Sequence, residues 1–316
     1  MRKLSRLYRF YQEYGYRCFA ARLLSELFPY TKQKSAVRDR ILQHKFDVYI
    51  GYLSKYYQEW RTDAGEQDAD DAQCSGHIWT AWLQGEDNAP EVIRLNLASV
   101  RENAGGHPVV VISNDNVDQY VSIPQTIKEK YRAGIIGQAH YADVVRMLLL
   151  AKYGGLWLDA SVFLYHPIDE HIFISPFYSV GFQADKGPYV SDHKWLVGVI
   201  GGEKNSRYVT AISRMLSMYW EEHDVPLDYF VFDYLIAVLY RNDLSFRAIV
   251  DQLPRMRFFT NSLKTIINEP YDQDAINGKI PDGQICCLSY RDRYQKITEE
   301  GQMTNYGFLC HELLEE

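Results

Sequence analysis

The segment from Gln138 to Pro167 restricts the possible folds of this chain more than any other stretch. Its first half has apolar residues at three- and four-residue spacing, which predicts an amphipathic helix: Ala142, Val145, Leu148 and Leu149. The pair Gly154–Gly155 can take the left-handed conformation that ends a helix, and the apolar run Leu156–Leu158 then suits a fully buried strand. This strand ends on a carboxylate, Asp159, before strand character returns in Val162–Leu164.

The chain on either side of this segment alternates strands and helices with short connections. Strands are predicted at 77–82 and 108–113, and helices at 90–103 and 125–131. Further strands are predicted at 179–184, 195–200 and 284–289, and helices at 205–222 and 227–240. This order predicts an α/β fold with a Rossmann-type, mostly parallel sheet flanked by helices. Such sheets bind ligands at the carboxyl ends of their strands, where Asp159 lies, although a carboxylate there can also serve only to cap a turn.

The composition is that of a globular protein, with 47% apolar and 24% charged residues. No window holds the roughly eighteen consecutive apolar residues that a membrane-spanning helix needs, and the N-terminus lacks the pattern of a secretion signal. The five cysteines form neither a disulfide framework nor a zinc-ligand pattern, so a cytoplasmic location is expected. The net charge of −7 combines +7 over residues 1–40 with −14 over the rest, and this acidic body argues against nucleic acid as the main partner.

Three regions are expected along the chain. They are a basic, aromatic helical region at residues 1–61, an acidic linker at residues 62–75 and a globular domain at residues 76–316. The first helix places arginines around a face rich in leucine and tyrosine, so residues 1–40 are expected to contact an anionic membrane surface, peripherally on its inner face. The alternative is a helix packed on the main domain with solvated arginines.

Several separate pieces of the sequence resemble one protein family. They are Ile78–Trp79 with Gln84–Gly85, Asp143 with Arg146, and the run Tyr153–Ser161. In this order they resemble the capsular polysaccharide synthesis proteins, bacterial sugar transferases related to glycosyltransferases with a DXD sugar-binding region. The resemblance covers residues 76–170 and continues more loosely through Asp228, Asp233 and residues 304–306. It implies a GT-A fold, a nucleotide-sugar donor with UDP as the expected nucleotide, a divalent cation (Mn²⁺ or Mg²⁺) and retention of anomeric configuration.

The resemblance also implies roles for individual residues. Donor contacts are expected from Ile78, Trp79, Gln84, Asp143, Arg146, Gly155, Asp159, Ala160 and Ser161, with Trp79 stacking on the base. Without the resemblance, Asp143 and Arg146 would be interpreted as a surface ion pair and Trp79 as a core residue. The expected metal ligands are Asp159, Ser161 and His311. Ser161 stands where the wider group has a second Asp, and a hydroxyl is a weaker ligand for these cations.

The expected catalytic residues are Asp159, Asp233 and Asp228. Asp228 and Asp233 lie in the apolar helix predicted at 227–240, where a carboxylate is unfavourable unless it is paired or bound to a cation. Five residues apart on a helix, they diverge by about 140°, so one is expected to face the site, and Asp233 is preferred. A cation held by Asp159 would stabilise the charge that develops on the departing diphosphate. A same-face displacement, in which that phosphate helps to deprotonate the acceptor, needs no further base.

Together these features predict a metal-dependent glycosyltransferase of the hexosyl type. Its acceptor would be a saccharide or a lipid-linked oligosaccharide in the synthesis of a bacterial capsular or other surface polysaccharide. Two other interpretations stay open. One is a sugar- or nucleotide-binding protein on the same fold without turnover, which Ser161 suggests. The other is a membrane-docked assembly protein whose basic helices carry its main function.

Overall fold

The computed structural model describes residues 2–27, 35–63, 76–182, 188–256, 263–279 and 285–315. Its central sheet has the order β2-β1-β3-β7-β5 and contains β1 (Ile78–Ala81), β2 (Val109–Ile112), β3 (Gly155–Leu158), β5 (Tyr178–Ser179) and β7 (Val199–Gly202). β1 pairs in parallel with β2 and β3, whereas β7 is antiparallel to both β3 and β5. Four of the five described strands therefore run in one direction, which confirms the predicted α/β class with a mostly parallel sheet.

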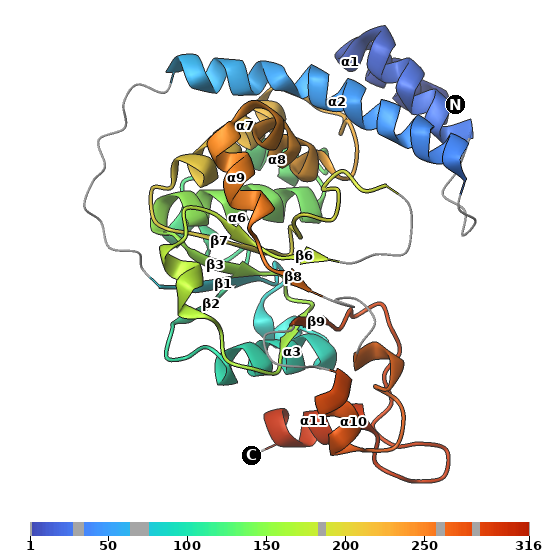
Figure 1. Ribbon diagram of the computed structural model, residues 1–316, viewed down its shortest axis with the longest axis vertical. Coiled ribbons are helices and arrows are strands. Elements are labelled where there is room, and N and C mark those ends of the chain that lie inside the picture. Colours follow the sequence, from blue (N-terminus) through green and yellow to red (C-terminus); the bar gives the residue numbers. More distant parts are fainter. Residues whose placement is uncertain are drawn as a thin grey trace.

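Helices cover both faces of this sheet (Figure 1). α6 (Gln138–Tyr153), α7 (Arg207–Glu222) and α8 (Val231–Asn242) lie on one face, and α3 (Glu91–Glu102) lies on the other. Within β3, Trp157 packs in the core cluster that contains α6 to α8, whereas Leu156 and Leu158 pack in a second cluster with residues of α3. Because successive side chains of a strand point to opposite faces, a sheet covered on both sides requires this uninterrupted apolar run.

Shorter elements complete the described chain. α4 (Val117–Tyr120) and α5 (Gln125–Arg132) connect β2 to α6, and α9 (Leu244–Asp251) follows α8. Two small sheets pair β4 (Val162–Leu164) with β9 (Ile285–Cys287) and β6 (Gly181–Phe182) with β8 (Arg255–Met256). The remaining elements are α10 (Gln273–Lys279), α11 (Asn305–Leu314) and short 3-10 helices at Glu86–Asn88, Glu170–Ile174 and Leu263–Thr265.

The two predicted N-terminal helices are α1 (Arg2–Leu27), which is kinked at Gly15 where φ is 72°, and α2 (Ala36–Asp63). α2 lies across α7 and α8 (Figure 1) and buries Tyr49, Leu53 and Tyr56 in the same core cluster as those helices. The N-terminal helices and the sheet therefore share one core. The acidic linker expected at residues 62–75 falls almost entirely outside the described residues, so the division of the chain there stays a prediction. No helix in the described ranges is both long and apolar enough to cross a membrane.

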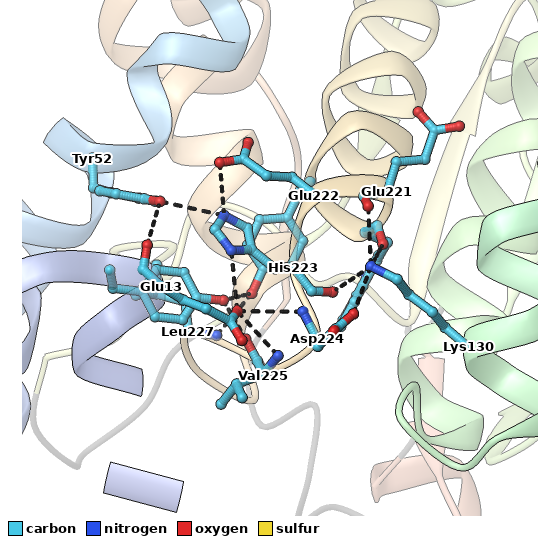
Figure 2. Close-up of polar contacts among 12 residues, drawn as sticks. Glu13, Tyr52, Lys130, Glu221, Glu222, His223, Asp224, Val225 and Leu227 are labelled. Atoms are coloured by element: carbon cyan, nitrogen blue, oxygen red, sulfur yellow. Dashed lines mark hydrogen bonds and ion pairs between the residues drawn. The ribbon is translucent and has the colours of Figure 1, made fainter. Parts of the chain in front are cut away.

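A cluster of polar groups fastens α1 to the end of α7 (Figure 2). Glu13 Oε2 accepts hydrogen bonds from the backbone N–H groups of Asp224 at 3.3 Å and Val225 at 3.2 Å, and it lies 3.2 Å from His223 Nδ1. Lys130 Nζ approaches from α5, donates to three carbonyl oxygens at the end of α7 and lies 2.8 Å from Asp224 Oδ1. The lysine thereby satisfies carbonyl groups that a helix end leaves free, and Glu13 holds the loop that follows.

Candidate active site

Asp159 lies at the carboxyl end of β3, and one of its two carboxylate oxygens is held by neighbouring side chains. Oδ1 accepts a hydrogen bond from Trp157 Nε1 at 2.8 Å and lies 2.7 Å from Arg146 Nη2. Oδ2 faces Gly198, where a Cβ atom would come within 2.9 Å of it, and no described residue donates a hydrogen bond to it. The side chain is 39% exposed. The carboxylate is therefore oriented from one side and open on the other.

Arg146 of α6 orients Asp159 through its contact with Oδ1. Its guanidinium is 4% exposed and lies 4.8 Å from the ring centre of Trp157 and 5.3 Å from that of Phe232, while Nη1 donates to the carbonyl of Val197. A buried cation needs its carboxylate partner, because a buried unpaired charge is strongly unfavourable. In this structure Arg146 positions Asp159, and its expected contact with the donor stays a prediction.

Two further carboxyl groups, Asp143 of α6 and Asp233 of α8, lie near Arg146. Asp143 Oδ1 is 3.4 Å from Arg146 Nη2, so the alternative of a surface ion pair is wrong because the guanidinium is buried. Trp195 Nε1 donates to Asp233 Oδ1 at 3.1 Å. Burial raises the pKa of Asp143 to about 7 against the effect of Arg146, and burial with the charge of Asp143 raises the pKa of Asp233 to about 7. These two groups can therefore hold or release a proton near neutral pH.

Asp228 has a different environment from Asp233. α8 begins three residues after Asp228, so the two carboxylates do not lie on one helix and the angle predicted between them does not apply. Asp228 Oδ2 is 2.8 Å from Lys45 Nζ of α2, and Oδ1 accepts a hydrogen bond from the N–H of Phe230 at 3.3 Å. The carboxylate thus neutralises a lysine and closes a local turn. Both oxygens of Asp228 are thus engaged away from Asp159, and its expected catalytic role stays a prediction.

The turn that follows Asp159 is held by α3 and β9. Asn96 of α3 is fully buried, and its Nδ2 donates to the carbonyl oxygens of Ala160 and Leu288 at 2.9 Å each. The carbonyl of Ser161 accepts a hydrogen bond from the N–H of Leu288 at 2.8 Å, and Cys287 Sγ lies 3.4 Å from Ser161 Oγ. The Ala160 carbonyl already accepts one hydrogen bond from Asn96, and the expected donor contact of Ala160 stays a prediction.

The expected metal ligands are not all brought together. His311 lies on α11, which Figure 1 shows well away from β3, and its Nδ1 is 3.1 Å from Glu315 Oε2. The prediction that His311 binds the metal is therefore wrong. Within the described ranges, no three His, Cys, Asp or Glu side chains are grouped to hold a metal ion. The turn still offers Asp159 Oδ2 and the Ser161 hydroxyl, and this pair fits a hard cation whose other ligands are phosphate oxygens and water.

The expected base-stacking residue, Trp79, is inside the sheet. Its side chain is 1% exposed, its Nε1 donates to the carbonyl of Gly154 at 2.9 Å, and its ring stacks on His77 at 4.8 Å. Ile78 is fully buried on the opposite face. Neither side chain is accessible to a base in this structure, so the expected contacts of Ile78 and Trp79 with the base stay predictions.

Trp82 is an aromatic residue at the correct edge that sequence reasoning missed. β1 pairs with β3 so that Trp79 lies opposite Trp157, and extending this register places Trp82 just beyond the level of Asp159. Its ring is half-buried, lies edge-on to Tyr290 at 5.5 Å, and its Nε1 has no hydrogen-bond partner among the described residues. The position of Trp82 in the sequence could have identified it, because Trp82 directly follows the last residue of a strand, as Asp159 does.

Gln84 and Gly155, also expected at the donor, lie at opposite ends of the sheet. Gln84 is exposed at the edge that carries Asp159, with Nε2 3.3 Å from Gln138 Oε1. Gly155 begins β3, so it lies about 13 Å of strand away from Asp159. Its φ is 104°, and a Cβ atom there would overlap the carbonyl oxygen of His77. The glycine is required by the sheet, and its expected donor contact is wrong.

Comparison with known proteins identifies relatives of this chain. O-glycosyltransferase braB of Annulohypoxylon truncatum is 24% identical over 160 residues, covering 46% of this chain and 38% of the relative. O-glycosyltransferase PaGT of Phomopsis amygdali is 27% identical over 103 residues, covering 30% and 25%. Glycosyltransferase afumC of Aspergillus fumigatus is 25% identical over 130 residues, covering 36% and 33%. The chain thus matches well under half the length of these fungal relatives.

Among solved structures, PaToxG glycosyltransferase aligns over 81% of this chain and 92% of its own, with 12% identity and a TM-score of 0.40. The model of the family described as capsular polysaccharide synthesis protein matches residues 30–306. This match covers most of the chain and includes every sequence piece on which the resemblance was based. The chain belongs to the capsular polysaccharide synthesis protein family.

Proposed function

We propose that this chain is a GT-A type glycosyltransferase that moves a hexosyl group from a nucleotide-sugar donor, expected to be a UDP-sugar, to a saccharide or lipid-linked oligosaccharide. Family membership and the names of three relatives support a sugar transferase. The observation that carries the proposal is Asp159, held by Arg146 and Trp157 at the carboxyl end of β3 with one oxygen open. The role in bacterial surface polysaccharide remains part of the proposal, since the three relatives are fungal.

Each group at this edge has a task in the proposed reaction. Asp159 and Ser161 would hold Mn²⁺ or Mg²⁺, which supplies positive charge for the departing diphosphate. Arg146 keeps the Asp159 carboxylate in one orientation, because Trp157 and Phe232 enclose the guanidinium. Asp143 and Asp233 hold a proton beside that carboxylate, and the exposed part of Trp82 stacks on the base. Retention of configuration belongs to the proposal and is read from the anomeric signal of the product.

The test is thermal stabilisation and hydrolysis with a panel of nucleotide sugars, with and without Mn²⁺. A ligand at about a hundred times its dissociation constant adds about 2.7 kcal/mol to the free energy of unfolding. Asp159→Asn should lose the Mn²⁺-dependent part of this stabilisation and slow hydrolysis about 100-fold. The matched control is Asp274→Asn, an exposed carboxylate on α10. Equal hydrolysis by wild type and Asp159→Asn would contradict the proposal.

A second candidate function is sugar or nucleotide binding without turnover. It is favoured by the ion pair between Asp159 and Arg146, which already neutralises the carboxylate, and by Ser161 in place of a second acid. The same panel separates the two functions. Stabilisation by a nucleotide sugar with no hydrolysis at any Mn²⁺ concentration would favour the binding protein.

We also propose that α1 rests on an anionic membrane. Exposed aromatic and aliphatic side chains on α1 lie among exposed arginines, namely Tyr8, Tyr11, Tyr16 and Leu27 with Arg6, Arg9 and Arg17. The positive charge of residues 1–40 is opposite to that of the rest of the chain. Rings and leucines that enter the headgroup region, with arginines facing anionic lipids, support peripheral binding near a lipid-linked acceptor.

Sedimentation of the full chain with vesicles of anionic or neutral lipids tests this contact. Replacement of Arg6, Arg9 and Arg17 by Glu should reduce partitioning into anionic vesicles at least about 100-fold, because each arginine near the surface contributes about 1 kcal/mol. Arg132, Arg214 and Arg293, also exposed, provide a matched triple replacement elsewhere on the surface. Equal binding by both triple variants would rule out α1 as the membrane contact.

A further inference from the structure

Two neighbouring aromatic side chains point into solvent just before α8. Tyr229 is 63% exposed and Phe230 is 49% exposed, whereas Leu227 and Val231 on either side are buried. The two rings are 5.3 Å apart and nearly perpendicular, with an interplanar angle of 88°. Single exposed aromatic residues are common, so their meaning depends on where the chain holds them.

The loop that carries these rings is held from several sides. Asp228 accepts a hydrogen bond from the N–H of Phe230 while it is paired with Lys45 of α2. The carbonyl of Tyr229 is 3.1 Å from Nε2 of His140, which lies in the first turn of α6. The first turn of α8 then carries Phe232, which contacts the guanidinium of Arg146, and Asp233. The rings thus lie four and three residues before Asp233, the carboxyl group of α8 that lies near Arg146.

A second exposed ring borders the same edge from β9. Tyr290 is 49% exposed, lies edge-on to Trp82, and has the guanidinium of Arg291 at 5.6 Å from its ring centre. The hydrogen bond between Gln84 and Gln138 joins the end of β1 to the start of α6, two residues before His140. The two exposed aromatic segments therefore border one surface.

We propose that Tyr229, Phe230 and Tyr290 form a binding site for a pyranose ring of the acceptor saccharide. One face of a pyranose carries apolar C–H groups that stack on aromatic rings, and its hydroxyls need the polar groups found beside these rings. Arg291 and the Tyr229 hydroxyl supply such groups, which a lipid tail would not use. That the bound saccharide is the acceptor rests on the function proposed above, whereas the binding of a saccharide here does not.

Saturation-transfer NMR on the full chain tests the site with methyl pyranosides and common disaccharides at millimolar concentration. Wild type should bind at least one of these saccharides. Tyr229→Ala, Phe230→Ala and Tyr290→Ala should each weaken that binding about tenfold. Phe230→Leu, which keeps an apolar side chain and removes the flat ring, should weaken it as well while leaving the fold intact. Tyr16→Ala on α1, at 72% exposure, is the matched control and should bind as wild type does.

The outcomes separate this inference from the proposed function. No binding of any tested saccharide by wild type, or equal binding by wild type and all four ring variants, overturns the inference. Binding that depends on the three rings, in a wild-type protein that hydrolyses no nucleotide sugar, leaves the saccharide site standing and removes the transferase. Nucleotide-sugar hydrolysis by wild type together with unchanged saccharide binding in the variants supports the transferase and overturns the saccharide site.

Discussion

Arg146 is the side chain on which the behaviour of three carboxyl groups depends. It lies 2.7 Å from Asp159 and 3.4 Å from Asp143, and its charge also acts on Asp233. One buried cation cannot neutralise three ionised carboxylates in a region of low dielectric. The most exposed of the three, Asp159, has the shortest contact with the guanidinium, and the two others have raised pKa values.

Asp233→Asn tests this distribution of charge through the pH dependence of stability. Burial and the charge of Asp143 raise the pKa of Asp233 from 3.8 to about 7 in the folded protein. Between about pH 4 and pH 7 the folded state therefore keeps a proton on Asp233 that the unfolded state releases. The free energy of unfolding is highest, as far as Asp233 affects it, below about pH 4 and falls as the pH rises to about 7. The asparagine keeps an acceptor for Trp195 and carries no charge, so the variant should be about 4 kcal/mol more stable than wild type above pH 7.

Urea unfolding across this pH range, without added divalent cation, provides the measurement. Asp274→Asn is again the control, because its carboxylate is exposed on α10. If wild type and Asp233→Asn lose stability with the same slope between pH 4 and 7, then Asp233 is ionised throughout and the assigned environment is wrong.

Gly155→Ala separates the structural role of this glycine from the donor contact first expected of it. Its φ of 104° and the position of the His77 carbonyl leave no room for a Cβ atom. The substitution should lower the free energy of unfolding by at least about 3 kcal/mol. Gly51→Ala on α2 is the matched control: no atom lies within 4 Å of its added Cβ, so it should be neutral or stabilise by up to about 1 kcal/mol. Equal urea midpoints for the two variants would contradict this role.

At the scale of elements, the order of helix, strand and carboxylate around β3 could be predicted because the spacing of apolar residues within this segment indicates the helix and the strand. The direction of β7 could not, since pairing between distant strands leaves no trace in an apolar run. The predicted start of α8 was four residues too early, because Asp228 accepts a hydrogen bond from the N–H of Phe230 and forms a turn before the helix begins. The base contact was assigned to Trp79 and not to Trp82 because a sequence motif gives the order of residues and not their burial. Only the strand register shows that Trp82 lies at the edge of the sheet that carries Asp159.

Glu13→Ala should loosen α1 from the body. The substitution removes the acceptor for the N–H groups of Asp224 and Val225 and the partner of His223 Nδ1. Of the groups left without this partner, the His223 side chain is buried, and loss of a partner for a buried polar group destabilises by about 1–3 kcal/mol. Hydrogen–deuterium exchange should therefore accelerate in α1 and in the loop after α7, while β3 changes little. Glu26→Ala, which removes an exposed i,i+4 pair with Arg22 on the same helix, should have little effect. Similar exchange in both variants would show that Glu13 does not anchor α1.

At the scale of the whole molecule, the N-terminal helices are part of the hydrophobic core. Phe10, Tyr14 and Leu53 belong to one buried cluster with Tyr219 and Tyr234 of α7 and α8. The N-terminal region expected at residues 1–61 was drawn from charge and composition, which do not show that α2 packs its inner face on α7 and α8, and its boundary at the linker stays a prediction. Each buried aromatic side chain contributes on the order of 2 kcal/mol, so this interface is an integral source of stability.

Deletion of residues 1–63 should leave a protein that aggregates or unfolds without cooperativity. The deletion would expose the aromatic side chains of α7 and α8 that α2 now covers. Size-exclusion chromatography and thermal unfolding give the measurement. Expression of residues 1–63 as a second chain should restore part of the soluble yield. A monodisperse truncated protein with a sharp unfolding transition would show instead that the sheet domain is independent.

The contact between Lys45 and Asp228 has a mechanical consequence. It joins the outermost layer of the molecule to the short loop from which Tyr229, Phe230 and the first turn of α8 emerge. A tilt of α2 relative to α7 and α8 would either break this ion pair or displace the loop that contains Asp228. Together with the pairs Asp47–Arg241 and Lys55–Glu222, this contact couples a displacement of α2 to the helix that carries Asp233.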